Sequence, residues 1–354
     1  MSAPLPGKDG REGYVFILAL AAIAALALVL AGAWAVQRAS SDGAAQLLSQ
    51  AQLEGDLRAA QATALHMLLT APRGETTVNP GGVANPDILE GGLIEEGYPI
   101  RADGEPRRIE INGRTIIIRL ISLQGLIGLN PGDPRMAQLF LEQAGLDAAE
   151  ASRLAARLAD YTDGDDLRRL GGAERGDYPE GRAPANAPLR AARELCAVHG
   201  WEVLPLCAED PRLMDLYFTV TPGASSHPAF LADHVQELLF ADAPPLTRMR
   251  QAFAPAITSF ADLGLDDWDP VHQGEFGYGP LGSEFLILTH EPQAGLVLAA
   301  QVRLTPGDVA SPYQTTFDFV IGGDRVEQEF GLTDAGDVEP FPVPEPPPDR
   351  PGRS

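Results

Sequence analysis

The chain has 354 residues and a formal net charge of −23, from 49 acidic and 26 basic side chains. This length is enough to bury a sizeable core and to form more than one domain. The excess of acid argues against a nucleic-acid partner, because phosphates are bound through lysine and arginine. It fits a solvated domain outside the cytoplasm, or one that binds divalent cations.

An unbroken apolar run, Tyr14–Val36, lies near the N-terminus and contains no charged residue. A helix needs about 20 apolar residues to cross a bilayer, so this run is long enough. Signal peptides have a shorter apolar core and a small-residue cleavage site, and nothing resembling such a site follows here. A polar leader over 1–13 that ends in Gly13, followed by Tyr14 and a long apolar helix, is typical of a prepilin. The alternative is a simple membrane anchor.

Helical periodicity continues beyond the apolar run, because apolar and small residues recur every three or four positions as far as Leu68. Pro72 closes the pattern, since proline breaks a helix interior. We predict one helix over 14–70, with 14–36 transmembrane and the second half against a globular head. The leader is placed in the cytoplasm.

The first part of the head, 71–123, opens with a stretch rich in Gly, Pro and Asn and ends in a predicted hairpin over 108–122. Asn112-Gly113 supplies the two positive-φ residues of a type I′ turn between β-branched strands.

The next section, 124–220, has a helical pattern. Asp133-Pro134 combines an N-cap with proline at the first helical position, and Gly145 ends that helix. A capping-box pattern at Asp147 opens a second helix that runs to about Tyr161.

A similar break at His199-Gly200-Trp201 follows a helical stretch over 189–198. These breaks predict helix-hairpin-helix-like units. DNA binding by them is not expected, because Asp147 and Glu202 follow the two turns and would repel phosphate.

The section over 221–338 contains a short predicted helix, 231–240, and three predicted strands over 284–289, 296–304 and 315–321. The links between the strands are too short for crossovers, so antiparallel pairing is expected. The proline-rich end, 339–354, is predicted to be a disordered tail. The fold class is therefore α+β: a long N-terminal helix packed on an antiparallel sheet, with an inserted all-helical domain.

One group of acidic residues is a candidate metal site, because carboxylates this close repel one another unless a cation neutralises them. Oxygen-only ligands favour Ca²⁺. The alternative is a solvated acidic turn in which some carboxylates cap the helix or the turn. Its members lie within 18 positions: Asp160, Asp163, Asp165, Asp166, Glu174 and Asp177.

The two cysteines, Cys196 and Cys207, form a possible disulfide if the head lies in an oxidising compartment; the alternative is two buried small residues. The chain has no nucleophile-elbow motif and no zinc-protease motif, and its histidines are scattered. No enzymatic activity is expected.

Several interior motifs resemble those of the type II secretion minor pseudopilin K (GspK) family, over most of the chain. An Asp-rich turn over 154–166 is followed by Gly-Gly-Ala-Glu at 171–174 and the acidic-aromatic pair Asp177-Tyr178. The segment 183–200 resembles the lead into that family's second helix-hairpin element, and 127–130 is a looser match. The Gly13–Tyr14 junction and the long helix match its N-terminal half.

The resemblance implies a pseudopilin fold and a non-enzymatic role at the tip of a short periplasmic pseudopilus. It implies cleavage by the prepilin peptidase after Gly13, methylation of Tyr14, and anchoring in the bacterial inner membrane. Partners would be two other minor pseudopilins, the peptidase and the inner-membrane platform. Most pilin-like subunits have Glu at the fifth position after the junction, where this chain has Leu18. That departure implies a subunit with nothing ahead of it.

Two other classes of function stay open at this point. One is a membrane-anchored periplasmic binding module that never enters a filament. The other is a minor subunit of a type IV pilus.

Overall fold

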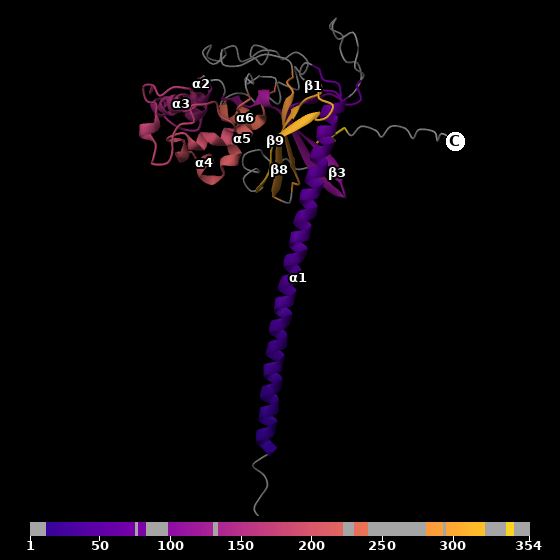
Figure 1. Ribbon diagram of the computed structural model, residues 1–354. Coiled ribbons are helices and arrows are strands. Elements are labelled where there is room, and N and C mark those ends of the chain that lie inside the picture. The colour runs from indigo at the N-terminus through magenta and orange to yellow at the C-terminus, as the bar shows by residue number, and fades with distance from the viewer. Residues whose placement is uncertain are drawn as a thin grey trace, which may run out of the picture. The chain divides into compact units, whose positions relative to one another are not determined.

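The computed structural model describes residues 12–74, 77–82, 98–129, 134–221, 230–239, 281–292, 295–322 and 338–342. The chain divides into two compact units, residues 1–55 and 56–354, and each is considered by itself. The helices and strands are shown in Figure 1. The α-helices are α1 (Glu12–Thr70), α2 (Pro134–Gln143), α3 (Ala148–Thr162), α4 (Pro205–Glu209), α5 (Met214–Tyr217) and α6 (Asp233–Leu239). The strands are β1 (Thr77–Val78), β2 (Ile100–Arg101), β3 (Asp103–Ile111), β4 (Arg114–Ser122), β5 (Ile127–Gly128), β6 (Phe218–Thr219), β7 (Glu284–His290), β8 (Leu296–Leu304) and β9 (Tyr313–Gly322).

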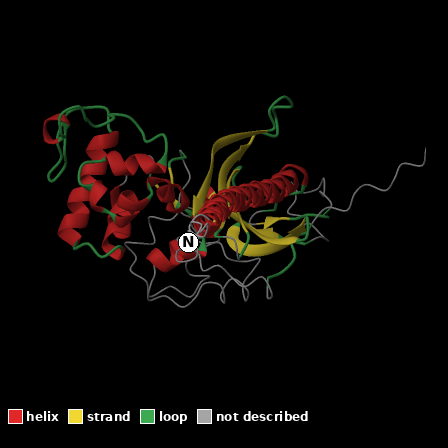
Figure 2. Ribbon diagram, turned by 90° about the horizontal axis from the view of Figure 1, so that it is seen from below, coloured by secondary structure: helices red, strands yellow, loops and turns green. Residues whose placement is uncertain are grey.

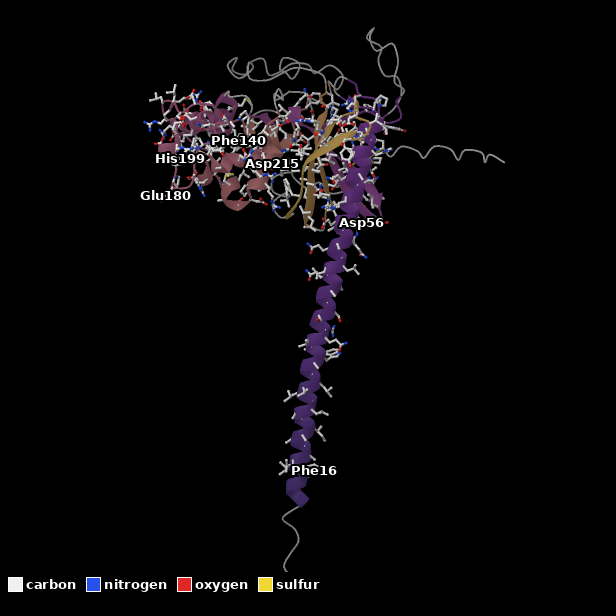
Figure 3. All side chains as sticks on the ribbon, viewed as in Figure 1. Phe16, Asp56, Phe140, Glu180, His199 and Asp215 are labelled. Carbon is white, nitrogen blue, oxygen red and sulfur yellow. A yellow bond between two sulfur atoms is a disulfide. The ribbon has the colours of Figure 1, made fainter. Side chains whose placement is uncertain are left out.

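The first unit contains the N-terminal part of α1. The helix is continuous through Ser40–Gly43, where the sequence pattern is weakest, and ends just before Pro72, as the pattern predicts. The apolar side chains over residues 16–36 are exposed; Phe16, labelled in Figure 3, is an example at 68%. This helix is long and apolar enough to cross a membrane, which is compatible with a single-pass anchor.

The second unit is built around a five-stranded antiparallel sheet with the order β3-β4-β7-β8-β9. The predicted hairpin is β3–β4, and Asn112 and Gly113 have φ angles of 50° and 80°, as a type I′ turn requires. The three predicted C-terminal strands are β7, β8 and β9, paired in chain order. Two short pairs, β1–β2 and β5–β6, lie outside this sheet.

The C-terminal part of α1 covers one face of the sheet. Leu57, Ala60 and Ala64 on this helix are fully buried, as its amphipathic pattern predicts. The Thr289 hydroxyl of β7 donates to the Leu57 carbonyl at 3.2 Å, and Arg58 pairs with Asp318 of β9 at 2.5 Å.

The helical insertion, residues 123–221, packs on the opposite face. Because side chains alternate along a strand, Phe317 and Phe319 point away from the Asp318 side. Arg193 and Arg212 of the insertion lie over these two rings. Figure 2 shows the helices of the insertion gathered to one side of the strands.

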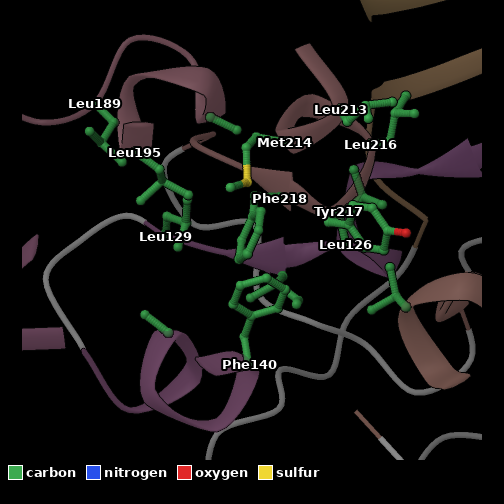
Figure 4. Close-up of a cluster of buried hydrophobic side chains, with 14 of the residues drawn as sticks. Leu126, Leu129, Phe140, Leu189, Leu195, Leu213, Met214, Leu216, Tyr217 and Phe218 are labelled. Atoms are coloured by element: carbon green, nitrogen blue, oxygen red, sulfur yellow. The ribbon is translucent and has the colours of Figure 1, made fainter. Parts of the chain in front are cut away.

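The insertion has its own apolar centre, shown in Figure 4. Phe140 of α2 meets Phe218 edge-on, with ring centroids 4.6 Å apart. Trp201 is fully buried and its indole N–H donates to the Leu154 carbonyl at 2.9 Å. This satisfied donor lets the largest side chain of the insertion fill its core at no polar cost.

The α+β fold class is confirmed: a long N-terminal helix, an antiparallel sheet and an inserted helical part. The helix-hairpin-helix geometry itself stays a prediction. At the first break, Gly145 has a φ of 95° between α2 and α3. At the second, the expected helix over 189–198 is a 3₁₀ segment, Ala192–Ala197. In that stretch the Ala192 N–H is bonded to the Asp215 carboxylate at 3.0 Å, and the Val198 N–H donates to the Leu195 carbonyl three residues earlier, as in a 3₁₀-helix.

The predicted disordered tail differs from the structure at its first four residues. Residues 339–342 lie along the outer edge of β3, where Pro340 forms a parallel bridge with Arg108. Phe341 is 4% exposed, and burial of this ring offsets the entropy lost on ordering the segment. Residues 343–354 lie outside the described part of the chain, as does the predicted N-cap Asp133.

Candidate functional site

The N-terminal residues singled out by sequence lie in the first unit. Gly13 and Tyr14 are in the first turn of α1, and Leu18 is 53% exposed one turn later. Cleavage and methylation at this junction stay predictions.

The six predicted metal ligands lie on one segment, residues 160–177, which we call the acidic turn. Helix α3 leads into it. The Asp147 carboxylate caps this helix by accepting the Glu150 N–H at 2.8 Å, and Leu154 and Leu158 anchor it in the core. The helix ends at Thr162, one turn after the core contacts, so Asp160 is buried and Asp163 becomes the C-cap.

Arg169 neutralises two of the six carboxylates. Its guanidinium donates to Asp160 at 2.9 Å and also contacts Asp163, while its backbone N–H donates to Asp160 at 3.1 Å. A Cβ on Gly172 would lie 1.9 Å from the Asp160 carboxylate, so only glycine allows the turn to close over this group. Asp160 is therefore a structural anchor of the turn.

The outer carboxylates also have partners. Asp165 accepts the Leu167 N–H at 2.8 Å, and Asp166 accepts from the Asn186 side chain at 3.2 Å. Asp177 pairs with Arg168 at 3.2 Å. It also accepts the Glu174 N–H at 2.9 Å, and this hydrogen bond is the main reason that the pKa of Asp177 is lowered.

Glu174 differs from the other five. It is 8% exposed, and within the described residues neither carboxylate oxygen has a hydrogen-bond partner. Desolvation raises the pKa of Glu174, and the nearby charges of Asp160 and Asp163 raise it further. One oxygen of Asp163 is likewise buried without a partner. Buried carboxylate oxygens without donors are the kind of group that a cation satisfies.

The acidic turn thus brings the six residues together in sequence order but ties most of them to arginines and backbone. Among the described residues, no three His, Cys, Asp or Glu side chains are grouped as metal ligands. Sequence reasoning missed Arg168, Arg169 and Asn186. The two arginines inside the acidic run were the available signal, because opposite charges at this separation pair readily.

The two cysteines form a disulfide, Cys196–Cys207, with their Cα atoms 5.4 Å apart. It joins the 3₁₀ segment at Ala192–Ala197 to α4 and lies at the edge of the insertion's core. The sequence left open a disulfide or two buried small residues, and the structure contains the disulfide.

A buried carboxylate outside the acidic turn, Asp215 in α5, was also missed. It accepts the Ala192 N–H and lies 3.6 Å from the Arg193 guanidinium. Burial raises its pKa to about 6. Figure 3 labels Asp215 within the insertion. This carboxylate joins two elements of the insertion, and it is not part of the acidic turn.

Comparison with known proteins gives two matches. Residues 120–205 match the family model described as type II secretion system (T2SS), protein K. The chain is similar to a chain in the crystal structure of the GspK-GspI-GspJ complex from the enterotoxigenic Escherichia coli type 2 secretion system. That similarity has a TM-score of 0.48 and 17% sequence identity, and it covers 78% of this chain and 99% of that chain. No curated protein matches the sequence. The family model confirms the resemblance to protein K over residues 120–205.

Proposed function

We propose that this chain, whose residues 120–205 belong to the type II secretion protein K family, is a minor pseudopilin that assists export of folded proteins. The role is structural and involves no catalysis. The observation that carries the proposal is the family-matching helical insertion between β4 and β7, in a chain whose α1 begins with an apolar segment of spanning length.

The apolar segment supports a place in the bacterial inner membrane, with the second unit in the periplasm. The disulfide agrees with this compartment, because disulfides persist where the surroundings are oxidising. We further propose that the prepilin peptidase cleaves after Gly13 and that the new terminus at Tyr14 is methylated.

Leu18 supports a position at the tip of the pseudopilus. A carboxylate at this position would pair with the terminal ammonium of a subunit ahead, and breaking such a pair in an apolar setting costs several kcal/mol. Leu18 makes no such pair, so a subunit ahead would gain nothing from this site. Two other minor pseudopilins are the proposed neighbours, and the secretion-system platform is the proposed base.

Mass analysis of the mature N-terminus tests the processing step. Protein purified from native membranes should begin at methylated Tyr14. The variant Gly13→Leu should retain the leader, while the matched variant Gly10→Leu in the same leader should be cleaved normally. A native chain that begins at Met1 would favour the plain membrane anchor and contradict the proposal.

Co-purification tests the assembly step. The processed chain should be recovered with two other pilin-like subunits encoded nearby. Recovery with type IV pilus subunits would favour the pilus alternative, and recovery alone would favour the binding module. Leu18→Glu should fold and be processed but should not lengthen the filament, because we propose that the bulky helical insertion obstructs a subunit ahead even when the carboxylate is restored. Longer filaments would show that the tip role rests on Leu18 alone.

We also propose that the acidic turn binds Ca²⁺ as a structural ion. Glu174 and Asp163 supply buried oxygens without donors, and Asp160, Asp165, Asp166 and Asp177 complete the acidic surroundings. A bound cation would supply the positive charge that Glu174 lacks. Arg169 holds Asp160 and Asp163 in place and also competes with the cation for them.

Thermal melting tests the calcium proposal without any activity assay. Ca²⁺ at a hundred times its Kd should stabilise the folded head by about 2.7 kcal/mol and raise its melting temperature. Glu174→Gln should reduce this calcium-dependent rise, whereas Glu180→Gln, an exposed carboxylate outside the turn, should leave it unchanged. Identical melting curves in excess Ca²⁺ and in chelator would exclude the site but leave the pseudopilin assignment intact.

A further inference from the structure

The C-terminal segment Val338–Pro342 lies against β3 through one parallel β-bridge, and we call this segment the edge cap. β3 is an outer strand of the five-stranded sheet, so one side of its backbone faces away from β4. On that side the Arg108 N–H donates to the Glu339 carbonyl at 2.9 Å. The Phe341 N–H donates to the Arg108 carbonyl at 2.7 Å. These two bonds are the pattern of a parallel bridge centred on Arg108 and Pro340.

Side chains fix the register of the edge cap. Val338 and Phe341 are 6% and 4% exposed, so both are buried against the head. Glu339 pairs with Arg107, whose guanidinium also contacts Glu105 at 3.1 Å. A one-residue slip would place a proline opposite the Arg108 carbonyl and would remove Glu339 from Arg107.

The prolines of the edge cap occupy only one set of alternating positions. Along a strand, successive residues direct their N–H groups to opposite sides. Phe341 directs its N–H to β3, so Pro340 and Pro342 have their nitrogens on the outer side. Proline carries no N–H, and this outer side therefore offers no donor at either position. Missing donors of this kind are one way that proteins protect sheet edges.

We propose that the β3 edge is a docking site for an extended segment, and that the chain's own edge cap is its resident occupant. The site selects an apolar residue, an acidic residue beside Arg107, a position that tolerates proline, and an aromatic residue with a free N–H. The edge cap is a removable intramolecular ligand. This docking site does not depend on the secretion role.

A peptide added in trans tests the proposal. The full-length chain is placed in lipid nanodiscs, and a second version ends after Asp337 so that β3 is uncovered. A fluorescent peptide of residues 336–344 should bind the shortened chain saturably. It should bind the intact chain at least tenfold more weakly, because the tethered cap competes at an effective concentration near millimolar. Equal, non-saturable binding to both chains would overturn the proposal, provided the shortened chain retains its β-sheet signal in circular dichroism.

Two peptide variants distinguish backbone hydrogen bonding at the β3 edge from non-specific apolar binding. N-methylation of the residue equivalent to Phe341 removes only the N–H and should weaken binding fivefold or more, since the Arg108 carbonyl loses its donor. Pro340→Ala restores an N–H on the outer side and should bind within twofold of the original. If both variants bind alike, the parallel register is wrong.

Charge reversal provides a rescue test. The Arg107→Glu chain should bind the native peptide more weakly and should regain binding to a peptide with Glu339→Lys. Failure of this rescue would show that the ion pair does not select the ligand.

Hydrogen exchange covers the case in which the shortened chain does not fold. In the intact chain, Phe341→Asp should release the cap and speed exchange of the Arg108 amide at least tenfold, while Pro340→Ala should not. Unchanged protection of the Arg108 amide in Phe341→Asp would contradict the docking site.

Discussion

The sheet and the helical insertion are stabilised in different ways. The sheet is held by four antiparallel ladders and by apolar side chains on both faces, so its stability is distributed over many similar contacts. The insertion contains short helices and 3₁₀ segments joined by individual side-chain bonds. Trp201 bonds the Leu154 carbonyl, Asp215 bonds the Ala192 N–H, and the Tyr178 hydroxyl accepts the His199 N–H at 3.2 Å.

This difference indicates that single substitutions act more strongly on the insertion than on the sheet. A ladder that loses one side chain keeps its backbone bonds, whereas an irregular loop that loses its one anchor has no substitute. The disulfide is placed where such support is scarcest, between a 3₁₀ segment and a five-residue helix. Four variants test this comparison.

Removal of Trp201 is expected to have the largest effect. Trp201→Ala leaves a cavity in the centre of the insertion and should lower the free energy of unfolding by about 3–5 kcal/mol. Hydrogen exchange should show loss of protection in α3 with little change in β7 and β8. Val203→Ala, at a site 70% exposed, is the matched control and should be neutral. Equal loss in both regions would show that they unfold as one.

Removal of the disulfide should rank next. The double variant Cys196→Ser/Cys207→Ser opens a short loop and should cost about 3 kcal/mol in denaturant unfolding. The loss should appear in the insertion alone. Reductant should destabilise the native chain by a similar amount and leave the double variant unchanged. If reductant shifts the double variant as well, the effect does not come from this bond.

The buried carboxylate of Asp215 predicts a pH dependence. Because burial raises its pKa to about 6, the folded state keeps this proton at pH values where the unfolded chain has lost it. Stability from this group is therefore greatest below pH 4 and falls as the pH rises towards 6, by roughly 1–3 kcal/mol. Asp215→Asn should flatten that part of the stability curve, measured by denaturation from pH 4 to 7. An unchanged stability curve in Asp215→Asn would show that Asp215 does not cause this pH dependence.

The smallest effect is expected at the boundary between the two regions. Arg212 is held by Asp210, lies 5.5 Å from the Phe319 ring and donates to the Val320 carbonyl at 3.3 Å. Arg212→Ala should lower the free energy of unfolding by about 1 kcal/mol, measured by denaturant unfolding, because the insertion loses this contact with β9. Arg190→Ala, whose side chain is 89% exposed, is the control. Larger destabilisation by Arg190→Ala would contradict a stabilising role of Arg212 at this boundary.

Sequence patterns predicted the elements that depend on local chemistry. Asn112-Gly113 specified the hairpin turn, Asp147 specified the start of α3, and apolar runs separated by short links specified β7 to β9. The edge cap was missed because a proline-rich segment has no internal preference for a sheet. Pairing with the distant strand β3 is what places the nitrogens of Pro340 and Pro342 on the side that faces away from the sheet. Pairing within the acidic turn was missed because Arg169 had many carboxylates within reach, and the choice of Asp160 depends on burial.

The adjacency of β4 and β7 has a consequence for the order of folding. The chain completes β4 at Ser122 and supplies its inner neighbour only at Glu284, after the whole insertion has been made. During synthesis, β4 therefore has only β3 as a neighbour in the sheet until the residues of β7 have been made. An insertion that compacts early brings its two ends together at the β5–β6 pair, and this shortens the search by which β4 and β7 meet. Early folding of the insertion thus assists assembly of the five-stranded sheet.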